Sequence, residues 1–260
     1  MSDPAATRSQ VTGLRDLHRA RLRRETGCCL VEGERLLGEA LDAGLVPRLV
    51  ALGPEVSDPA REVVERARAA GAPVVSLAKR DAERASDREH APGLLASIPI
   101  PEAWNGSLTE SGPALLVALC GLQDPGNVGA LLRSARAFGA AAALLGPGSA
   151  DAFGPKVVRA SAGAALRVPV ANCAIEELAA LAERHALTLA TAIPPARADG
   201  GAHASLPERS LLVLGHETRG VPALPGAEPV SIPQDPMVES LNVAAAGAVL
   251  MAGWYASRSS

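Results

Sequence analysis

Aromatic side chains are scarce in this chain, where they make up 2% of 260 residues: Trp104, Trp254, Tyr255, Phe138 and Phe153. Proteins that read single-stranded RNA by stacking its bases need aromatic platforms, so this scarcity argues against that mode of binding. The apolar fraction is nevertheless 48%. A core of Ala, Val and Leu can therefore form, and wholesale disorder is excluded.

Cysteines and long apolar runs are also few. Cys28, Cys29, Cys120 and Cys173 show no CxxC or Cys/His spacing, so we expect free thiols and no metal site. No apolar run reaches the roughly 18 residues of a membrane span, and no charged-then-apolar leader opens the chain. These absences predict a cytoplasmic protein.

Several common catalytic motifs are missing as well. The stretch from Gly121 to Gly129 contains no lysine, so it is not a phosphate-binding P-loop, and no strand is followed by GxGxxG. His216 and Glu217 are not followed by the second histidine of a zinc peptidase. Ser161 lacks the leading glycine of a hydrolase nucleophile elbow.

The first part of the chain alternates between helical and strand patterns, which predicts a small α/β domain over residues 8–100. Helices are expected at 9–24, 32–43 and 60–70, and strands at 28–31, 49–52 and 74–77. Pro, Gly, Ser and Asn then crowd together, so residues 101–113 are predicted to be a linker.

The second part, residues 114–258, alternates in the same way. Strands are expected at 115–120, 142–145, 187–192, 211–214 and 229–232, and helices at 128–138, 155–165, 175–185 and 239–256. Continuously apolar strands separated by helices are typical of a mostly parallel sheet that is covered on both faces. The predicted fold class is therefore α/β for both domains.

A cluster of arginines opens the chain, although the formal net charge is −3. Such a stripe suits RNA phosphates, which it would bind with little sequence preference. The alternative is a solvated amphipathic helix. The cluster consists of Arg8, Arg15, Arg19, Arg21, Arg23 and Arg24.

Three polar segments follow predicted strands of the second domain. The first runs Gln123-Asp124-Pro125-Gly126-Asn127-Val128-Gly129 and continues to Arg133, with Asn127 as a candidate N-cap. The second is Gly215-His216-Glu217-Thr218-Arg219-Gly220, and the third runs from Ile232-Pro233 to Glu239-Ser240-Leu241-Asn242-Val243. Each alone could be an ordinary turn or a capped helix. Ligands of parallel sheets bind at the carboxyl ends of strands, so three such loops together predict one site.

In order and spacing these segments resemble the three motifs of the SpoU class of RNA methyltransferases, within the SPOUT superfamily. The resemblance covers about residues 114–256, including the intervening segment from Phe153 to Ala164. The front of the chain, with Val31-Glu32-Gly33, is similar to the ribosomal-protein-like RNA-binding domain that precedes many of these enzymes.

The resemblance implies a SPOUT α/β domain tied in a trefoil knot, a homodimer packed at that knot, and S-adenosylmethionine as cofactor. The residues it places at the cofactor are Thr191, Ala192, Leu214, Gly215, Gly220, Ile232, Pro233, Ser240 and Leu241.

The resemblance also implies a catalytic set, made up of Arg133, Asn127, Glu217, Ser240 and Asn242. A guanidinium with a pKa above about 12 is a poor base, so we expect Arg133 to hold the phosphate beside the target hydroxyl. Arg159 joins the arginines of the front domain as a predicted RNA contact.

The resulting hypothesis is S-adenosylmethionine-dependent methylation of a ribose 2′-hydroxyl in RNA, with large-subunit ribosomal RNA favoured over transfer RNA. A transfer RNA methyltransferase and a non-catalytic RNA-binding ribosome-assembly factor remain open alternatives. An unrelated α/β nucleotide-binding enzyme is a third, and it would not bind S-adenosylmethionine.

Overall fold

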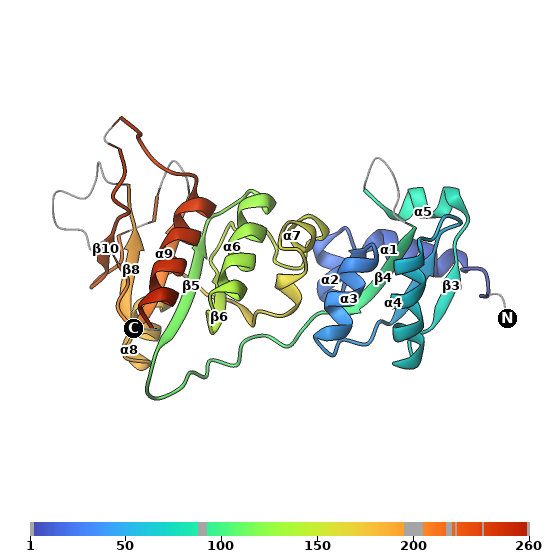
Figure 1. Ribbon diagram of the computed structural model, residues 1–260, viewed down its shortest axis with the longest axis horizontal. Helices are drawn as coiled ribbons and strands as arrows, with labels where there is room; N and C mark the ends of the chain where they lie inside the picture. The colour runs from blue at the N-terminus through green and yellow to red at the C-terminus, as the bar shows by residue number, and fades with distance from the viewer. Residues whose placement is uncertain are drawn as a thin grey trace. The chain divides into compact units, whose positions relative to one another are not determined.

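The computed structural model describes residues 3–87, 93–194, 205–216, 220–221, 223–235 and 237–258. The chain divides into two compact units (Figure 1). The first consists of Met1–Pro101 together with Phe153–Arg167, and the second of Glu102–Ala152 together with Val168–Ser260. Across the described residues, no helix is both long and apolar enough to cross a membrane.

Helices and strands alternate along both units. The helices are α1 (Arg8–Asp16), α2 (Ala20–Thr26), α3 (Glu34–Asp42), α4 (Asp58–Ala69), α5 (Lys79–Ala85), α6 (Pro125–Ala137), α7 (Pro155–Ala160), the short 3₁₀ helix η1 (Ala164–Leu166), α8 (Glu177–Arg184) and α9 (Val243–Ser257). The strands are β1 (Cys28–Glu32), β2 (Leu49–Leu52), β3 (Val74–Ser76), β4 (Leu94–Pro99), β5 (Ala114–Cys120), β6 (Ala142–Leu145), β7 (Val170–Asn172), β8 (Thr188–Ala192), β9 (Arg209–Gly215) and β10 (Glu228–Val230).

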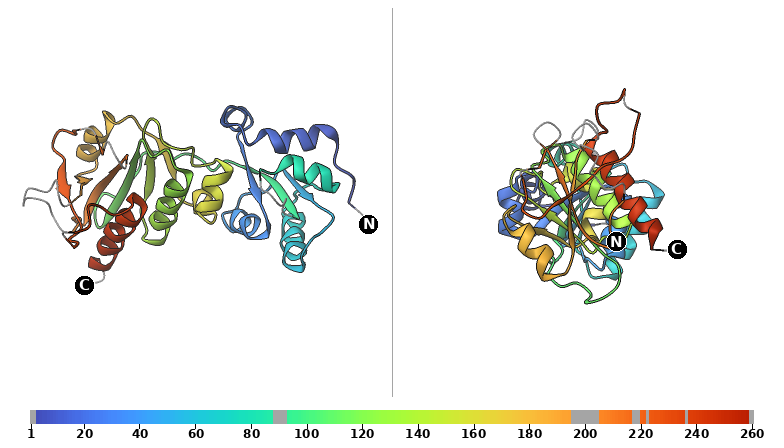
Figure 2. Two further views of the ribbon diagram at one scale, coloured as in Figure 1. Left: turned by 90° about the horizontal axis from the view of Figure 1, so that it is seen from above. Right: turned by 90° about the vertical axis from the view of Figure 1, so that its left-hand side faces the viewer.

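The first unit contains a four-stranded sheet in the order β1-β4-β2-β3, in which β4 runs antiparallel to both of its neighbours. Helices α1 and α5 cover one face of this sheet and α3 and α4 the other (Figure 2). The sequence patterns did not predict α5 or β4. Strand β4 ends at Pro99, where the proline-rich composition concealed it, although it is the strand that holds β1 and β2 together.

The arginine-rich helix expected over residues 9–24 is two helices, because the chain breaks between Asp16 and Ala20. The guanidinium of Arg23 stabilises this break by donating hydrogen bonds to the carbonyl oxygens of Leu17 (2.8 Å) and His18 (3.0 Å). Arg23 is only 4% exposed. Its predicted role as an RNA contact is therefore wrong, since its charged group lies inside the unit and binds the backbone.

Segment Phe153–Arg167, which the sequence placed within the second domain, packs with the first unit. Val158 and Leu166 join the apolar core beside α3 and α4. The fully buried carboxylate of Glu32 forms an ion pair with Arg159 and accepts a 2.6 Å hydrogen bond from Ser86 Oγ. A buried carboxylate requires such partners, so Arg159 serves the fold of this unit. The domain boundaries drawn from the sequence stay a prediction.

The second unit contains a six-stranded sheet in the order β10-β8-β9-β5-β6-β7, and every neighbouring pair is parallel. The predicted α/β class with a mostly parallel sheet, preceded by a small α/β unit, is confirmed. The short strand β7 escaped prediction because its three residues, Val-Ala-Asn, give no distinctive pattern.

Helices α6 and α9 lie side by side on one face of this sheet, and α8 lies on the other (Figures 1 and 2). Gly247 allows the close approach of α9 to α6 and β9. A Cβ atom at this position would clash with Leu131 Cδ2 and lie 2.8 Å from Leu214 Cδ1. A larger residue would therefore require the side chains of Leu131 and Leu214 to shift.

The predicted linker, residues 101–113, contains no helix or strand and is fastened onto the second unit. Trp104 donates its backbone N–H to the Val170 carbonyl oxygen over 3.0 Å. The guanidinium of Arg209 donates to the carbonyl oxygens of Gly112 (2.7 Å), Thr109 (3.2 Å) and His185 (2.8 Å). These bonds attach the segment along much of its length.

Candidate functional site

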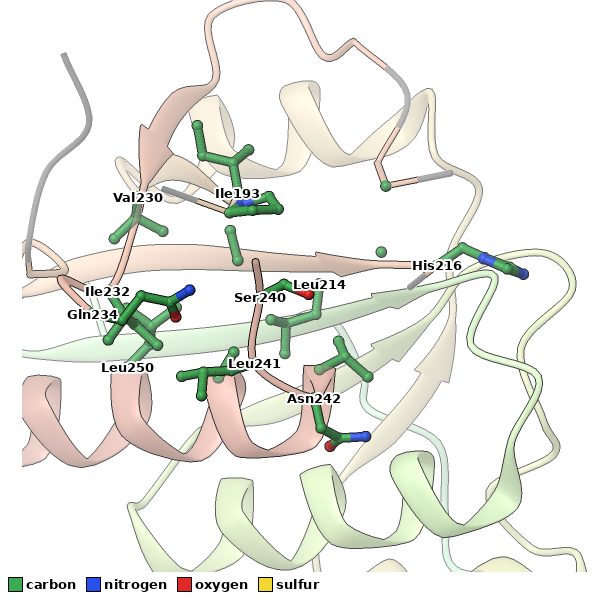
Figure 3. Close-up of a pocket in the computed structure, with 16 residues that line it drawn as sticks. Ile193, Leu214, His216, Val230, Ile232, Gln234, Ser240, Leu241, Asn242 and Leu250 are labelled. Atoms are coloured by element: carbon green, nitrogen blue, oxygen red, sulfur yellow. The ribbon is translucent and has the colours of Figure 1, made fainter. Parts of the chain in front are cut away.

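A pocket of about 260 Å³ opens where β8, β9 and β10 end and α9 begins. Parallel strands present their carboxyl ends at one edge of the sheet, so the loops that follow them meet there. The walls of the pocket are mainly apolar, with a few polar groups (Figure 3). The lining residues are Ala192, Ile193, Pro194, Leu214, Gly215, His216, Gly220, Val230, Ile232, Gln234, Ser240, Leu241, Asn242, Val243, Ala246 and Leu250.

Seven of the nine residues predicted to contact the cofactor line this pocket: Ala192, Leu214, Gly215, Gly220, Ile232, Ser240 and Leu241. Thr191 and Pro233 do not line it. Thr191 lies within β8, paired with Val213 on one side and Pro229 on the other, and Pro233 is exposed. The loops that follow β8, β9 and β10 thus meet at one cavity. Of the three polar segments predicted to form it, the second and third line it and the first, from Gln123 to Arg133, does not.

Sequence reasoning missed part of the pocket wall. Ala246 and Leu250 contribute from α9, one turn apart and in line with Asn242. This i, i+4, i+8 spacing marks one face of a helix and could have identified them. The strand-end residue Val230 carried no such signal, because apolar residues at strand ends are common.

Asn242 lines the pocket (Figure 3), and its side chain is hydrogen-bonded to Asn127, a second predicted catalytic residue 115 positions away. Asn242 caps α9, since its Oδ1 accepts hydrogen bonds from the N–H groups of Ala244 (2.9 Å) and Ala245 (3.3 Å). Its Nδ2 is therefore left to donate to Asn127 Oδ1, over 3.1 Å. The cap fixes which end of the amide faces α6.

The sequence predicted Asn127 as the N-cap of α6, but the N-cap is Asp124. The Asp124 carboxylate accepts from the N–H groups of Gly126 (3.1 Å) and Asn127 (3.2 Å). The Asn127 side chain is thereby released from capping and reaches Asn242. Asn127 therefore directs its side-chain amide oxygen at the N-cap residue of α9.

The remaining predicted catalytic residues are placed differently. Ser240 lines the pocket directly before α9. Arg133 is exposed on α6 and does not line the pocket, and it makes no hydrogen bond or ion pair with the residues that the structure describes. An exposed guanidinium can bind an anion through parallel N–H donors. Glu217 lies outside the described residues.

The backbone at Gly215 approaches a neighbouring loop closely. A Cβ atom at Gly215 would lie 2.6 Å from the carbonyl carbon of Gly220 and 2.5 Å from Val221 Cγ2. Gly220 donates its N–H to the His216 carbonyl oxygen over 2.7 Å, and Gly220 has a φ of +70°. Glycine at both positions thus lets Gly220 and Val221 lie close against the end of β9.

The two thiols near this edge of the sheet are not nucleophiles. Burial raises the pKa of Cys120 to about 11, with a further contribution from Cys173. Burial raises the pKa of Cys173 to about 11 as well, helped by Glu177. The thiolate is the reactive form of cysteine, so both groups are inert at neutral pH.

The arginines predicted to contact RNA lie in the first unit. Arg8, Arg15, Arg19, Arg21 and Arg24 are exposed on α1, on α2 or between them. Arg21 pairs with Glu25 over 2.7 Å, and Asp16 pairs with Arg15 (3.2 Å) and Arg19 (4.0 Å). Exposed pairs of this kind are weak and exchange readily for a phosphate.

Three side chains of the first unit have oxygen or nitrogen atoms within 4.8 Å of one another: His18, Glu32 and Asp87. Arg159 is already bound to this cluster, pairing with Glu32 and with Asp87 (3.0 Å). Burial opposes ionisation of Asp87, but the hydrogen bond and charge of Arg159 outweigh it and lower the pKa of Asp87. A guanidinium thus already balances the carboxylates of this cluster.

Two family models match this chain, one in each half of the sequence. Residues 114–252 match the model of the SpoU rRNA Methylase family, and residues 8–96 match an MRM3-like substrate binding domain. A Mycobacterium bovis protein described as an uncharacterized tRNA/rRNA methyltransferase is 32% identical over 96% of this chain and 79% of its own length.

Two solved structures share the fold along the whole chain. One is an RNA 2′-O ribose methyltransferase, 27% identical with a TM-score of 0.82, where the match covers 100% of both chains. The other is an AdoMet-bound rRNA methyltransferase from Sinorhizobium meliloti, 22% identical with a TM-score of 0.83, where the match covers 99% of this chain and 98% of that one.

Proposed function

The chain belongs to the SpoU rRNA methylase family of RNA methyltransferases, and we propose that it methylates a ribose 2′-hydroxyl of ribosomal RNA with S-adenosylmethionine. The observation that carries the proposal is the pocket at the ends of β8, β9 and β10, with the Asn242–Asn127 hydrogen bond at its rim. The pocket can hold a cofactor while the rim holds the ribose.

The residues of the pocket fit S-adenosylmethionine. Its volume of about 260 Å³ lies just below the roughly 300–1,000 Å³ that is typical of ligand sites. Leu214, Ile232 and Leu250 offer apolar walls for a flat base, and Ser240 and Gln234 add polar groups. When bound, the cofactor would supply an electrophilic methyl group on a sulfonium sulfur.

The chain's own residues must hold the ribose and help remove its proton, because a hydroxyl is a poor nucleophile. Alignment of reacting groups can lower a barrier by several kcal/mol, and by roughly 7–11 in ideal cases. Asn242 and Asn127 form a hydrogen-bonded amide pair, and Ser240 lines the same pocket as Asn242. We assign these three residues to positioning of the ribose.

We assign to Arg133 the phosphate beside the target nucleotide. Its guanidinium is exposed on α6, and none of the described residues pairs with it. Arginine binds phosphate through two parallel N–H donors, which also fixes its orientation. This role needs no proton transfer to the guanidinium.

Two comparisons support the finer parts of the proposal. The structure that is 27% identical over its whole length is described as an RNA 2′-O ribose methyltransferase, which favours the ribose over a base. The curated relative is described as acting on tRNA or rRNA. We favour ribosomal RNA because a separate unit with exposed arginines precedes the methyltransferase unit.

The proposal is tested by incubating the full-length protein and methyl-labelled S-adenosylmethionine with ribosomal RNA or with transfer RNA. Nuclease digestion and chromatography then identify the labelled nucleoside. We expect a 2′-O-methylnucleoside, formed faster with ribosomal RNA. Label in a base would contradict the ribose assignment, and faster labelling of transfer RNA would contradict the substrate. No label in either RNA would favour a non-catalytic RNA-binding factor.

We propose further that the second unit is a SPOUT trefoil knot and that it assembles as a homodimer through α9. Helix α9 carries no charged side chain from Val243 to Ser257, yet it exposes Val249 (50%) and Tyr255 (46%). A helix that is apolar on every side is normally buried. A second copy of the same helix would cover it symmetrically.

The dimer is tested by light scattering after size-exclusion chromatography. Val249→Glu places a charge on the exposed apolar face and should shift the protein from dimer to monomer. Ala180→Glu, at an exposed position of α8, is the matched control and should remain dimeric. A monomeric unmodified protein would refute the assembly.

A further inference from the structure

Helices α1 and α5 of the first unit border a groove of about 820 Å³ that lies outside the candidate methyltransferase site. We propose that this groove binds the sugar-phosphate backbone of the RNA substrate, with Arg84 as its third cationic residue. The inference rests on the proposed function for the identity of the polyanion. The groove is lined by Ala6, Arg8, Val11, Thr12, Arg15, Asp81 and Arg84.

The packing of the two helices creates the groove. Leu14 of α1 is buried in the same apolar cluster as Ala82 and Ala85 of α5. Short alanine side chains let the two helices approach closely. The polar residues beside this seam then face each other across it, and a sequence reading of α1 alone cannot find Arg84.

The polar residues follow helical spacing on both walls. Arg8, Thr12 and Arg15 lie at i, i+4 and i+7, which is one stripe of α1. Asp81 and Arg84 lie at i and i+3 on α5. Over seven residues a helix rises roughly 10 Å, so Arg8 and Arg15 can contact successive groups of an extended polyanion instead of a single small ion.

The lining chemistry favours a polyanion. Five of the seven lining residues are polar or charged, whereas small-molecule pockets are mostly apolar. Three guanidinium groups face one carboxylate, so the groove is cationic on a chain whose formal net charge is −3. Such a concentration of positive charge is the electrostatic footprint of nucleic-acid binding.

The arginines of the groove are available to a ligand. Arg8 and Arg84 are exposed, and among residues 3–87, 93–194 and the later described segments neither has an ion-pair partner. Arg15 pairs with Asp16 over 3.2 Å, but its side chain is 52% exposed. Phosphate oxygens can therefore reach all three without breaking a buried interaction.

Asp81 is the one acidic residue among the described residues that line the groove. It lies in the first turn of α5, where a carboxylate stabilises the helix. A carboxylate beside a phosphate is repulsive, however. If RNA phosphates occupy the groove, removing this charge should strengthen binding, an outcome that a purely structural role for Asp81 does not predict.

The first test compares Arg84→Gln with Arg80→Gln in the full-length protein. Both arginines are exposed on α5 and lose the same charge, but only Arg84 lines the groove. Fluorescence anisotropy with a labelled RNA hairpin is measured from 50 to 250 mM salt. Arg84→Gln should weaken binding about three- to tenfold and reduce the salt slope by roughly 0.7–0.9. Equal losses in both variants would overturn the proposal.

The second test compares Asp81→Asn with Glu83→Gln, which removes the same charge from an exposed position of α5 outside the groove. Asp81→Asn should tighten RNA binding by about threefold and Glu83→Gln much less. Weaker binding by Asp81→Asn, or equal tightening in both variants, would overturn the proposal.

Methyl transfer separates the groove from the proposed function. If the unmodified protein methylates RNA but Arg84→Gln and Arg80→Gln bind RNA alike, the groove fails and the function stands. If the groove variants behave as expected but no RNA is ever methylated, the function fails and the groove stands. Calorimetry should show unchanged S-adenosylmethionine affinity in Arg84→Gln, which shows that the second unit is intact, and an unchanged Tm shows that the first unit is folded.

Discussion

Replacement of Gly215 by alanine is the perturbation whose effect the structure defines most closely. The new Cβ would lie 2.6 Å from the carbonyl carbon and oxygen of Gly220, about 0.8 Å inside the 3.4 Å at which ordinary contact begins. Val221 Cγ2 would lie 2.5 Å away. Two of these three atoms belong to the backbone, so a side-chain rotation cannot relieve the clash.

Relief therefore requires the Gly220 segment to move by nearly an ångström. Overpacking of this kind costs about 1–3 kcal/mol of folding free energy. For a chain of this size each kcal/mol lowers Tm by about 2–4 °C. Gly215 and Gly220 both line the pocket, so the same movement widens it at the cofactor. We expect a loss of at least tenfold in S-adenosylmethionine affinity, about 1.4 kcal/mol.

Isothermal titration calorimetry measures the affinity and scanning calorimetry the Tm. Gly13→Ala is the control, because nothing lies within 4 Å of a Cβ placed at this position of α1. It should stabilise the protein by up to about 1 kcal/mol and leave cofactor binding unchanged. Unchanged affinity and Tm in Gly215→Ala would refute the close contact between the two loops.

The remaining predictions concern the rim and the core. Asn242→Ala removes the cap of α9 and should cost about 1 kcal/mol of stability as well as methylation activity. Asn242→Asp should keep the cap but lose the donor to Asn127, and so should lose methylation activity to the same extent without the loss of stability. Full activity in Asn242→Asp would show that the Asn242–Asn127 hydrogen bond is not needed for methylation. Arg133→Ala should abolish methylation while calorimetry shows cofactor affinity within about twofold, and near-normal turnover would remove Arg133 from the mechanism. Burial raises the pKa of Cys120 from 9.0 to about 11, so the contribution of the protonated thiol to folding stability is complete below pH 9 and is lost as the pH rises through 11. The free energy of unfolding measured in urea should fall by on the order of 2–3 kcal/mol between these two pH values, and it should fall by less in Cys120→Ala.

The sheet of the second unit was readable from the sequence because its strands are buried on both faces. The segments at β5 and β6 are unbroken apolar runs, and every residue in them is buried. Antiparallel β4 was not predicted, although it is mostly apolar, because Pro99 and Pro101 led to the prediction of a linker. Composition around an element therefore outweighed the signal of the element itself.

The convergence of the site followed from one rule about parallel sheets, that their loops meet at the carboxyl ends of strands. The rule placed Gly215, Ile232 and Leu241 together correctly. It could not say that Asp124 would cap α6 and release Asn127, because both residues lie where a cap is possible. That choice depends on atomic distances and not on residue type.

The role of each arginine was the least readable feature. Arg8 and Arg23 carry the same charge in the same basic stretch, yet one is exposed at a groove and the other is 4% exposed and bonded to backbone carbonyls. Arg159 is likewise held by a buried carboxylate. Net charge predicts attraction to RNA, but only tertiary structure shows which guanidinium groups can reach it.

We propose that this chain methylates a ribose of ribosomal RNA. The most direct test of this proposal is to map 2′-O-methylated nucleotides in cells. Ribosomal RNA from cells with and without the gene is compared, position by position, by resistance to alkaline cleavage. We predict that one site loses its methyl group in the deletion and regains it with the unmodified gene but not with Arg133→Ala. Identical methylation patterns in all of these cells would contradict the account.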